Sequence, residues 1–255
     1  MHKVFKYAVV AFLFAAFILY GLAVKLFITE PIALRRHRVK TVQKFARLGA
    51  RVFGLEISVK DPERFRAGQN YLIVGNHLSY LDGIILGAFA PVCFITSVEM
   101  RQAFFLGLIT ELAGCLYVER RSREKIGDEI SEITTALREG FNVVIFPEAT
   151  STNGSSVLPF KRSLLASAVQ ADRPLLPLTI NYNFIDGEPV TAKNRDLLCW
   201  YGDMNFGPHF FKFVGLSKIE ISLHLLPEIA STGRTREELS ESAYSAIAKD
   251  YVPIL

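Results

Sequence analysis

The chain has 255 residues, of which 50% are hydrophobic, and its formal net charge is +4 at pH 7. This length fits one main domain, and the positive mean hydropathy of +0.26 points to a membrane. The small net charge and the lack of a nucleic-acid motif exclude nucleic acid as the expected partner. The three cysteines form no Cys-x-x-Cys pair and predict neither a disulfide framework nor a zinc site, which fits a reduced compartment.

The N-terminal region, residues 1–54, is predicted to anchor the protein to a membrane. Residues 7–24 are 18 uncharged, mostly apolar positions bounded by Lys6 and Lys25. This is close to the ~20 residues that cross the hydrocarbon layer. A cleaved signal peptide is the alternative, but no small-x-small cleavage site follows the run, which favours an uncleaved anchor.

A basic segment follows the apolar run. Residues 35–51 contain seven Lys or Arg and no acidic residue, and Val42, Phe45 and Leu48 recur at helical spacing. The pattern predicts a basic amphipathic helix on an anionic membrane surface, with an ordinary solvated basic face as the alternative. By the positive-inside rule, this charge places residues 55–255 in the cytoplasm.

Beyond residue 54, short apolar runs alternate with helical patterns. This alternation predicts an α/β domain with a largely parallel central sheet flanked by helices. The expected strands are residues 55–59, 71–74, 92–96, 115–118, 143–146, 175–181 and 219–226. The expected helices are residues 81–89, 104–113 and 126–137, with Gly140 ending the third, and a last helix that opens at the capping box Thr235-x-x-Glu238.

His77 lies where the second strand is expected to end and a helix to begin, and Asp82 follows five residues later. That edge of an α/β sheet is where ligands usually bind. An imidazole takes up a proton near neutral pH, and a carboxylate on its other nitrogen fixes the tautomer. The pair therefore suits general-base catalysis. Ser79-x-x-Asp82 also has the outline of a capping box, in which Asp82 would only accept helix N–H groups.

Four blocks, in order, resemble the glycerolipid acyltransferases typified by bacterial 1-acyl-glycerol-3-phosphate acyltransferase. They are His77-(four residues)-Asp82, the block over residues 114–120 that ends in Arg120, Phe146-Pro147-Glu148-Ala149-Thr150, and Leu176-Pro177-Leu178. The resemblance covers residues 71–182. It implies transfer of an acyl group from acyl-CoA or acyl carrier protein to a lysolipid, without a cofactor, with His77 as the base and Asp82 as its partner.

The resemblance also implies residues that bind the acceptor, which are Glu148, Thr150, Ser151, Arg120, Lys161 and Arg162. Glu148 is expected near the acceptor, or alternatively as a strand-end carboxylate bonded to backbone amides. Arg120 is expected to hold a phosphate through a two-pronged contact, or alternatively to pair with a neighbouring glutamate. No metal site is expected, because no second histidine or cysteine stands at ligand spacing.

Three features depart from the family pattern, and the first is the run over residues 95–100, which has no lysine where the family has a lysine-rich run. Ser151 stands where the family has an arginine on the acceptor phosphate, so lysophosphatidic acid is not the expected preferred acceptor. Ala149 replaces a glycine, so the backbone there must tolerate a Cβ. Residues 152–164 and the run Tyr201-Gly202-Asp203-Met204 resemble members that acylate other lysophospholipids or lyso-ornithine lipid.

The expected function is a membrane-bound O-acyltransferase of lipid biosynthesis or remodelling, at a bacterial inner membrane with the catalytic domain in the cytoplasm. A lipid hydrolase that uses the same histidine and aspartate on water is one alternative, and a non-catalytic, membrane-tethered lipid-binding module is another. The chain has no Gly-x-Ser-x-Gly, Gly-x-Gly or P-loop pattern. Their absence argues against a serine hydrolase, a dinucleotide enzyme and a nucleoside triphosphatase.

Overall fold

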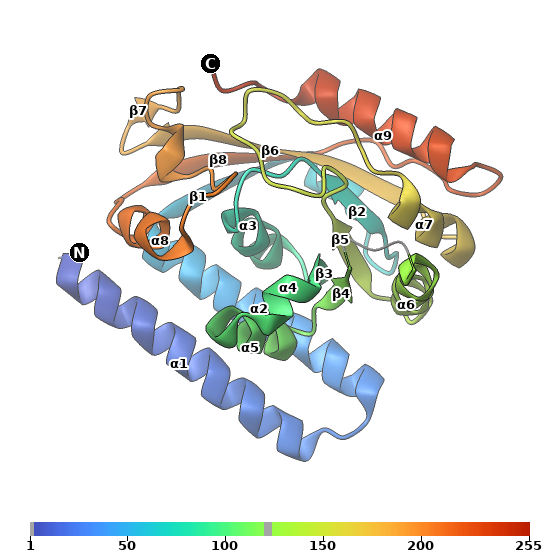
Figure 1. The fold of residues 1–255 in the computed structure, drawn as a ribbon, viewed down its shortest axis with the longest axis horizontal. Helices are drawn as coiled ribbons and strands as arrows, with labels where there is room; N and C mark the ends of the chain where they lie inside the picture. The colour runs from blue at the N-terminus through green and yellow to red at the C-terminus, as the bar shows by residue number, and fades with distance from the viewer. Residues whose placement is uncertain (1–2, 120–123) are drawn as a thin grey trace.

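The computed structural model describes residues 3–119 and 124–255. Within this part of the chain, one eight-stranded sheet has the order β1-β8-β6-β2-β5-β3-β4, with β7 beside β6 (Figure 1). The strands are β1 (Leu55–Lys60), β2 (Leu72–Gly75), β3 (Val92–Ser97), β4 (Leu116–Val118), β5 (Asn142–Ile145), β6 (Leu175–Ile185), β7 (Glu188–Pro189) and β8 (Ile219–Leu225). Along that order, only β6 and β8 pair antiparallel, which confirms the predicted α/β fold with a largely parallel sheet.

Helices flank the sheet, and α9 lies on the side opposite to α1, α2 and α3 (Figure 1). The α-helices are α1 (Lys3–Phe27), α2 (Pro31–Phe53), α3 (Leu81–Phe89), α4 (Val98–Gln102), α5 (Phe104–Ala113), α6 (Ile126–Arg138), α7 (Ala166–Ala171), α8 (Phe206–Val214) and α9 (Arg236–Asp250). Short 3₁₀ turns cover Pro62–Arg64, Ser163–Leu165 and Arg195–Leu197. Helices α3 and α5 have the predicted bounds. Helix α9 begins at the predicted capping box, whose Thr235 and Glu238 side chains each accept the other residue's backbone N–H.

The core lies on both faces of the central strands. Strand β2 is buried along its whole length, as expected for an inner strand of a parallel sheet. Helix α6 contributes Ile133 and Leu137 to this core. Strand β6 runs to Ile185, beyond the predicted end at Asn181, because its antiparallel pairing with β8 continues as far as Ile219.

Helices α1 and α2 form an antiparallel hairpin along one side of the domain (Figure 1). Among the described residues, one helix is long and apolar enough to cross a membrane, Val4–Phe27 within α1. Apolar side chains seven residues apart remain uncovered along it, with Phe5, Phe12, Leu19 and Leu26 exposed by 60%, 70%, 68% and 78%. The hairpin therefore presents a stripe of apolar surface.

Both ends of α1 are bound to the rest of the protein. Near the start, Lys6 Nζ donates to the backbone carbonyl oxygens of Phe53, at 3.2 Å, and Leu216. Near the end, Lys25 pairs with Glu111 of α5 at 3.0 Å. Helix α2 contributes buried side chains to the same hydrophobic core as the sheet, and the division of the chain after residue 54 stays a prediction.

Candidate active site

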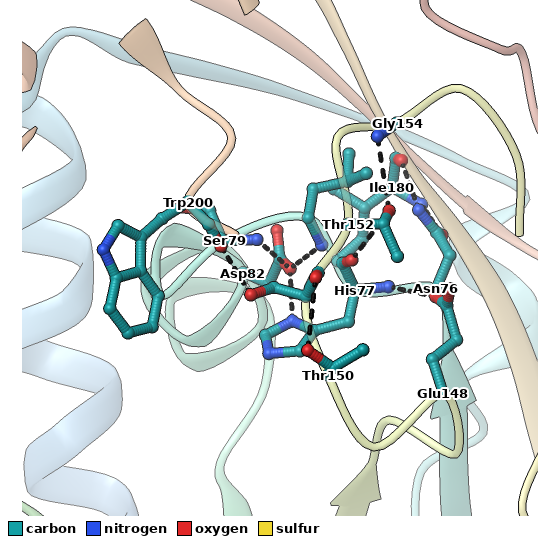
Figure 2. Close-up of polar contacts among 12 residues, drawn as sticks. Asn76, His77, Ser79, Asp82, Glu148, Thr150, Thr152, Gly154, Ile180 and Trp200 are labelled. Carbon is teal, nitrogen blue, oxygen red and sulfur yellow. Dashed lines mark hydrogen bonds and ion pairs between the residues drawn. The ribbon is translucent and has the colours of Figure 1, made fainter. Parts of the chain in front are cut away.

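The loop between β2 and α3 brings His77 and Asp82 together (Figure 2). His77 Nδ1 lies 2.7 Å from Asp82 Oδ2. The same carboxylate oxygen accepts the backbone N–H groups of Leu78 at 2.8 Å and Ser79 at 3.0 Å, and the other oxygen accepts the Tyr182 hydroxyl at 2.6 Å. Since an ionised Asp82 can only accept, the neutral His77 ring carries its proton on Nδ1 and its lone pair on Nε2.

The His77 ring is held flat against Phe146, with ring centroids 4.1 Å apart and an interplanar angle of 9°. Its side chain is 20% exposed and lines a large cavity. Within the described residues, Nε2 has no hydrogen-bond partner. The free nitrogen can therefore accept a proton from a ligand hydroxyl in the cavity.

Contacts with β6 hold the loop between β2 and α3 in this shape. The side chain of Asn76 donates from Nδ2 to the Ile180 carbonyl at 3.0 Å and accepts the Ile180 N–H at its Oδ1 at 2.8 Å. The Asn76 side chain thus continues the hydrogen bonding between β2 and β6 by one residue, as far as the position before His77. At Gly75, a Cβ would come within 2.8 Å of the Leu178 side chain, so the close approach of the two strands favours glycine.

Glu148 lies beside the pair, and backbone donors occupy both of its oxygens. Oε1 accepts the His77 N–H and Oε2 accepts the Leu158 N–H, each at 2.7 Å. Burial raises the pKa of this carboxyl, while the two backbone donors act in the opposite direction. The geometry supports the alternative of a strand-end carboxylate bonded to backbone amides. Contact between Glu148 and the acceptor stays a prediction.

The residues after Glu148 turn sharply along the cavity wall. Ala149 has φ 60°, in the left-handed region that glycine adopts more easily, which accounts for the glycine in the family pattern. Thr150 Oγ1 donates to the Ser151 carbonyl at 3.4 Å, and Ser151 Oγ donates to the Trp200 carbonyl at 2.5 Å. Thr150 and Ser151 both line the cavity that holds His77, and their contact with a ligand stays a prediction.

The three predicted basic residues differ in their surroundings. Lys161 and Arg162 are exposed and lie on the wall of the same cavity. Arg162 Nε is 3.4 Å from Oε1 of Glu237 in α9, so this guanidinium already has an acidic neighbour. Arg120 lies outside the described residues. The structure thus places the predicted residues other than Arg120 either on the wall of one cavity or, for Asp82 and Glu148, in hydrogen-bond contact with His77.

The cavity measures about 1270 Å³ and reaches Phe14 of α1. Much of its wall is apolar, and this part includes Phe94, Ile95, Leu106, Ile109, Phe206 and Phe210. An apolar space of this size can hold a long alkyl chain beside the His77 ring. Among the described residues, no group of three or more His, Cys, Asp or Glu side chains is placed to hold a metal ion.

Sequence reasoning missed three residues that shape the site. Tyr182 donates a hydrogen bond to Asp82, and Phe146 stacks on the His77 ring. The backbone N–H of Trp200 donates to the Leu78 carbonyl at 2.9 Å. Burial, and then the charge of Asp82, raise the pKa of Tyr182 well above its usual value, so its hydroxyl remains a donor. The available signal for Tyr182 was its position directly after a predicted strand.

Comparisons with known proteins agree with the resemblance seen in the four blocks. The family model described as Acyltransferase matches residues 56–181. The lyso-ornithine lipid O-acyltransferase of Brucella abortus (strain 2308) is 31% identical over 198 residues, which cover 75% of this chain and 73% of the relative. The chain belongs to the acyltransferase family.

Other members of this acyltransferase family are also similar. The lyso-ornithine lipid O-acyltransferase of Pseudomonas aeruginosa is 34% identical over 181 residues, covering 70% of this chain and 67% of the relative. The 1-acyl-sn-glycerol-3-phosphate acyltransferase of Neisseria gonorrhoeae is 27% identical over 208 residues, covering 80% and 78%. The predicted enzyme class, acyltransferase, is therefore confirmed.

One solved structure shares the fold over nearly the whole chain. The 1-acyl-sn-glycerophosphate (LPA) acyltransferase from Thermotoga maritima superposes with a TM-score of 0.69 at 19% identity, covering 97% of this chain and 92% of that chain. This likeness concerns the backbone arrangement, including the N-terminal helices.

Proposed function

We propose that this acyltransferase moves a fatty acyl group from an acyl thioester to the free hydroxyl of a lysolipid, in the synthesis or remodelling of membrane lipids. The supporting observation is the His77–Asp82 pair, whose free Nε2 faces a large apolar cavity. The donor is acyl-CoA or acyl carrier protein, and no cofactor takes part. Lyso-ornithine lipid and lysophosphatidic acid are the acceptor classes suggested by the names of the relatives.

In the proposed reaction, the lysolipid hydroxyl gives its proton to His77 Nε2 while its oxygen attacks the thioester carbonyl carbon. The new C–O bond forms and the carbonyl π electrons move onto oxygen. Asp82 stabilises the imidazolium through the Nδ1–H bond. When the tetrahedral intermediate collapses, the C–S bond breaks and the thiolate takes the proton from Nε2. The products are an ester and a free thiol.

A labelled acyl thioester, incubated with the membrane-bound protein and a panel of lysolipids, tests this proposal. A labelled diacyl lipid supports acyl transfer. Free fatty acid as the main product instead identifies a hydrolase that activates water. The absence of both products, with the lysolipid still bound, identifies a non-catalytic lipid-binding module.

We expect Ser151→Arg to shift acceptor preference towards lysophosphatidic acid. Ser151 has a hydroxyl where the family has an arginine, and a hydroxyl cannot neutralise a phosphate dianion. A charge-assisted hydrogen bond contributes roughly 1.5–3 kcal/mol, on the order of tenfold or more in affinity. The measurement is kcat/KM for lysophosphatidic acid and for lysolipids with larger, less charged head groups, in both proteins.

Ser151→Ala is the matched control for this exchange, since it removes the hydrogen bond to the Trp200 carbonyl without adding charge. It should leave the order of acceptors unchanged. A strong wild-type preference for lysophosphatidic acid that Ser151→Arg does not alter would show that another residue holds the phosphate, with Lys161 and Arg162 as the nearest described candidates.

The N-terminal hairpin is the part of the protein that we assign to the cytoplasmic face of a bacterial inner membrane. Its apolar stripe on α1 suits the hydrocarbon. Exposed bases on α2 suit anionic head groups, and they are Arg36, Lys40, Lys44, Arg47 and Arg51. A spanning helix would separate its ends by about 30 Å of hydrocarbon. The contacts of Lys6 and Lys25 with one domain therefore favour insertion from one side.

The wild-type protein should stay on anionic vesicles in high salt, whereas the double variant Phe12→Glu, Leu19→Glu should be released. Both side chains are exposed, so the change removes apolar contact without disturbing the core. The two carboxylates interrupt the apolar stripe at its centre, so the screened attraction of the α2 bases becomes the main remaining contribution to binding. Sedimentation with vesicles at low and high salt measures this. The control Lys40→Glu, Lys44→Glu should weaken binding at low salt and leave the salt-resistant fraction intact. Wild-type protein that washes off in high salt would rule out the anchor.

A further inference from the structure

Ser79 lies in the loop that holds His77, and its hydroxyl takes no part in the contacts of the His77–Asp82 pair. The residue is 0% exposed. Its Oγ has no hydrogen-bond partner in the described part of the chain. Ser79 also lines the cavity that holds His77. A buried hydroxyl without a partner destabilises a protein, so native structures contain few of them and tend to keep them for a reason.

Helix capping does not account for this hydroxyl. The pattern Ser79-x-x-Asp82 predicts that Ser79 Oγ accepts the Asp82 N–H. In the structure that N–H donates to the backbone carbonyl of Ser79 instead, at 3.1 Å. The other half of the box is present, because Asp82 Oδ2 accepts the Ser79 N–H at 3.0 Å. Asp82 therefore holds the backbone of Ser79 through hydrogen bonds, whereas the Ser79 hydroxyl takes no part in capping α3.

A role as the attacking nucleophile does not fit either. A nucleophilic serine needs a hydrogen bond to its base. Ser79 Oγ has no such bond. Among the described residues, the His77 ring forms a hydrogen bond through Nδ1 alone, and its partner there is Asp82. The hydroxyl nevertheless sits two residues from the base and beside the same cavity. What remains is an O–H donor without a partner, beside the cavity that holds His77.

We propose that Ser79 donates this hydrogen bond to the thioester carbonyl oxygen as negative charge develops on it. The inference rests on the proposed function. When the acceptor oxygen bonds to the carbonyl carbon, the carbonyl π electrons become a lone pair on oxygen, and Ser79 Oγ–H stabilises that oxyanion. Collapse of the intermediate restores the C=O bond, expels the thiolate and releases Ser79 unchanged. Because Ser79 is 0% exposed, contact between its Oγ and the acyl carbonyl requires a local shift of the cavity wall.

Because the hydroxyl has no hydrogen-bond partner, we expect its removal to lower the catalytic rate without lowering the stability. Ser79→Ala should lower kcat on the order of 10²–10³-fold, the usual effect of removing one oxyanion donor, with little change in the KM for the lysolipid. Its Tm should equal or exceed that of the wild type, because the substitution removes an unsatisfied polar group and no hydrogen bond. Steady-state kinetics with the acyl thioester and thermal unfolding of the full-length protein measure both effects.

Ser167 in α7 is the matched control. It is also 0% exposed, but its Oγ donates to the Leu164 carbonyl at 2.7 Å. Ser167→Ala should lower Tm by about 2–4 °C and leave kcat unchanged. If Ser79→Ala instead lowers Tm as Ser167→Ala does, or keeps the wild-type kcat, the inference is overturned while the proposed function stands. A wild-type protein that transfers no acyl group to any lysolipid overturns the proposed function, and the inference with it.

Discussion

His77→Ala should lower kcat for acyl transfer on the order of 10²–10⁴-fold, the usual contribution of a general base. The side chain faces the cavity, and among the described residues its only side-chain hydrogen bond joins it to Asp82. Removing it leaves the β2–α3 backbone contacts in place, so the variant should fold. The measurement is the rate of ester formation from a labelled acyl thioester, alongside thermal unfolding of the same preparation.

The chain offers a second histidine–aspartate pair as a control. His224 Nδ1 lies 2.8 Å from Asp250 Oδ1, a contact similar in length to that of His77 with Asp82, and His224 does not line the cavity. His224→Ala should therefore lower Tm and keep the wild-type kcat. Folded His77→Ala protein with near-wild-type acylation would contradict the proposed mechanism.

The contact between His77 and Asp82 could be expected from the sequence because its signals are local. A buried strand, a glycine and a helix follow one another along the chain, and the two residues are five positions apart. The support from Tyr182 could not be expected in the same way, because 100 positions separate it from Asp82. That contact exists only because β6 lies next to β2 in the sheet.

Helix α8 shows a different limit of sequence reasoning. Gly207 and Pro208 interrupt its first turn and mask its helical signal. The first turn tolerates proline, since an N–H there has no partner within the helix, and the Asn205 side chain caps the helix by accepting the Gly207 N–H at 3.2 Å. Phe206 and Phe210 of this helix then line the cavity. Part of the apolar wall thus lies on a segment for which the sequence predicted no helix.

For Glu148, the sequence left two readings that only tertiary contacts can separate. A carboxylate that follows a strand at the ligand-binding edge of a sheet can contact either the acceptor or backbone N–H groups. In the structure it links two loops, one through the His77 N–H and the other through the Leu158 N–H. Glu148 and His77 are 71 residues apart, so the sequence alone did not indicate that they are joined by a hydrogen bond.

Asp82→Asn should also lower kcat on the order of 10²–10⁴-fold, by analogy with the aspartate of serine-protease triads. Oδ2 accepts from His77 and from the N–H groups of Leu78 and Ser79. If the asparagine oxygen takes this place, the fold is preserved but the imidazolium loses the negative charge that stabilises it. If the amide NH₂ takes it, two backbone donors lose their acceptor and His77 is forced into the tautomer whose Nε2 cannot accept a proton.

Tyr182→Phe serves as the control for Asp82→Asn. Among the described residues it removes the one donor to the other carboxylate oxygen, so it keeps both the charge and the contact with His77. We expect it to lower the free energy of unfolding by about 1–3 kcal/mol and to reduce kcat far less than Asp82→Asn does. The measurements are kcat across neutral pH and thermal unfolding for both variants. If Asp82→Asn lowered only the stability and kept the wild-type kcat, Asp82 would be the capping residue of α3 and not the partner of a catalytic base.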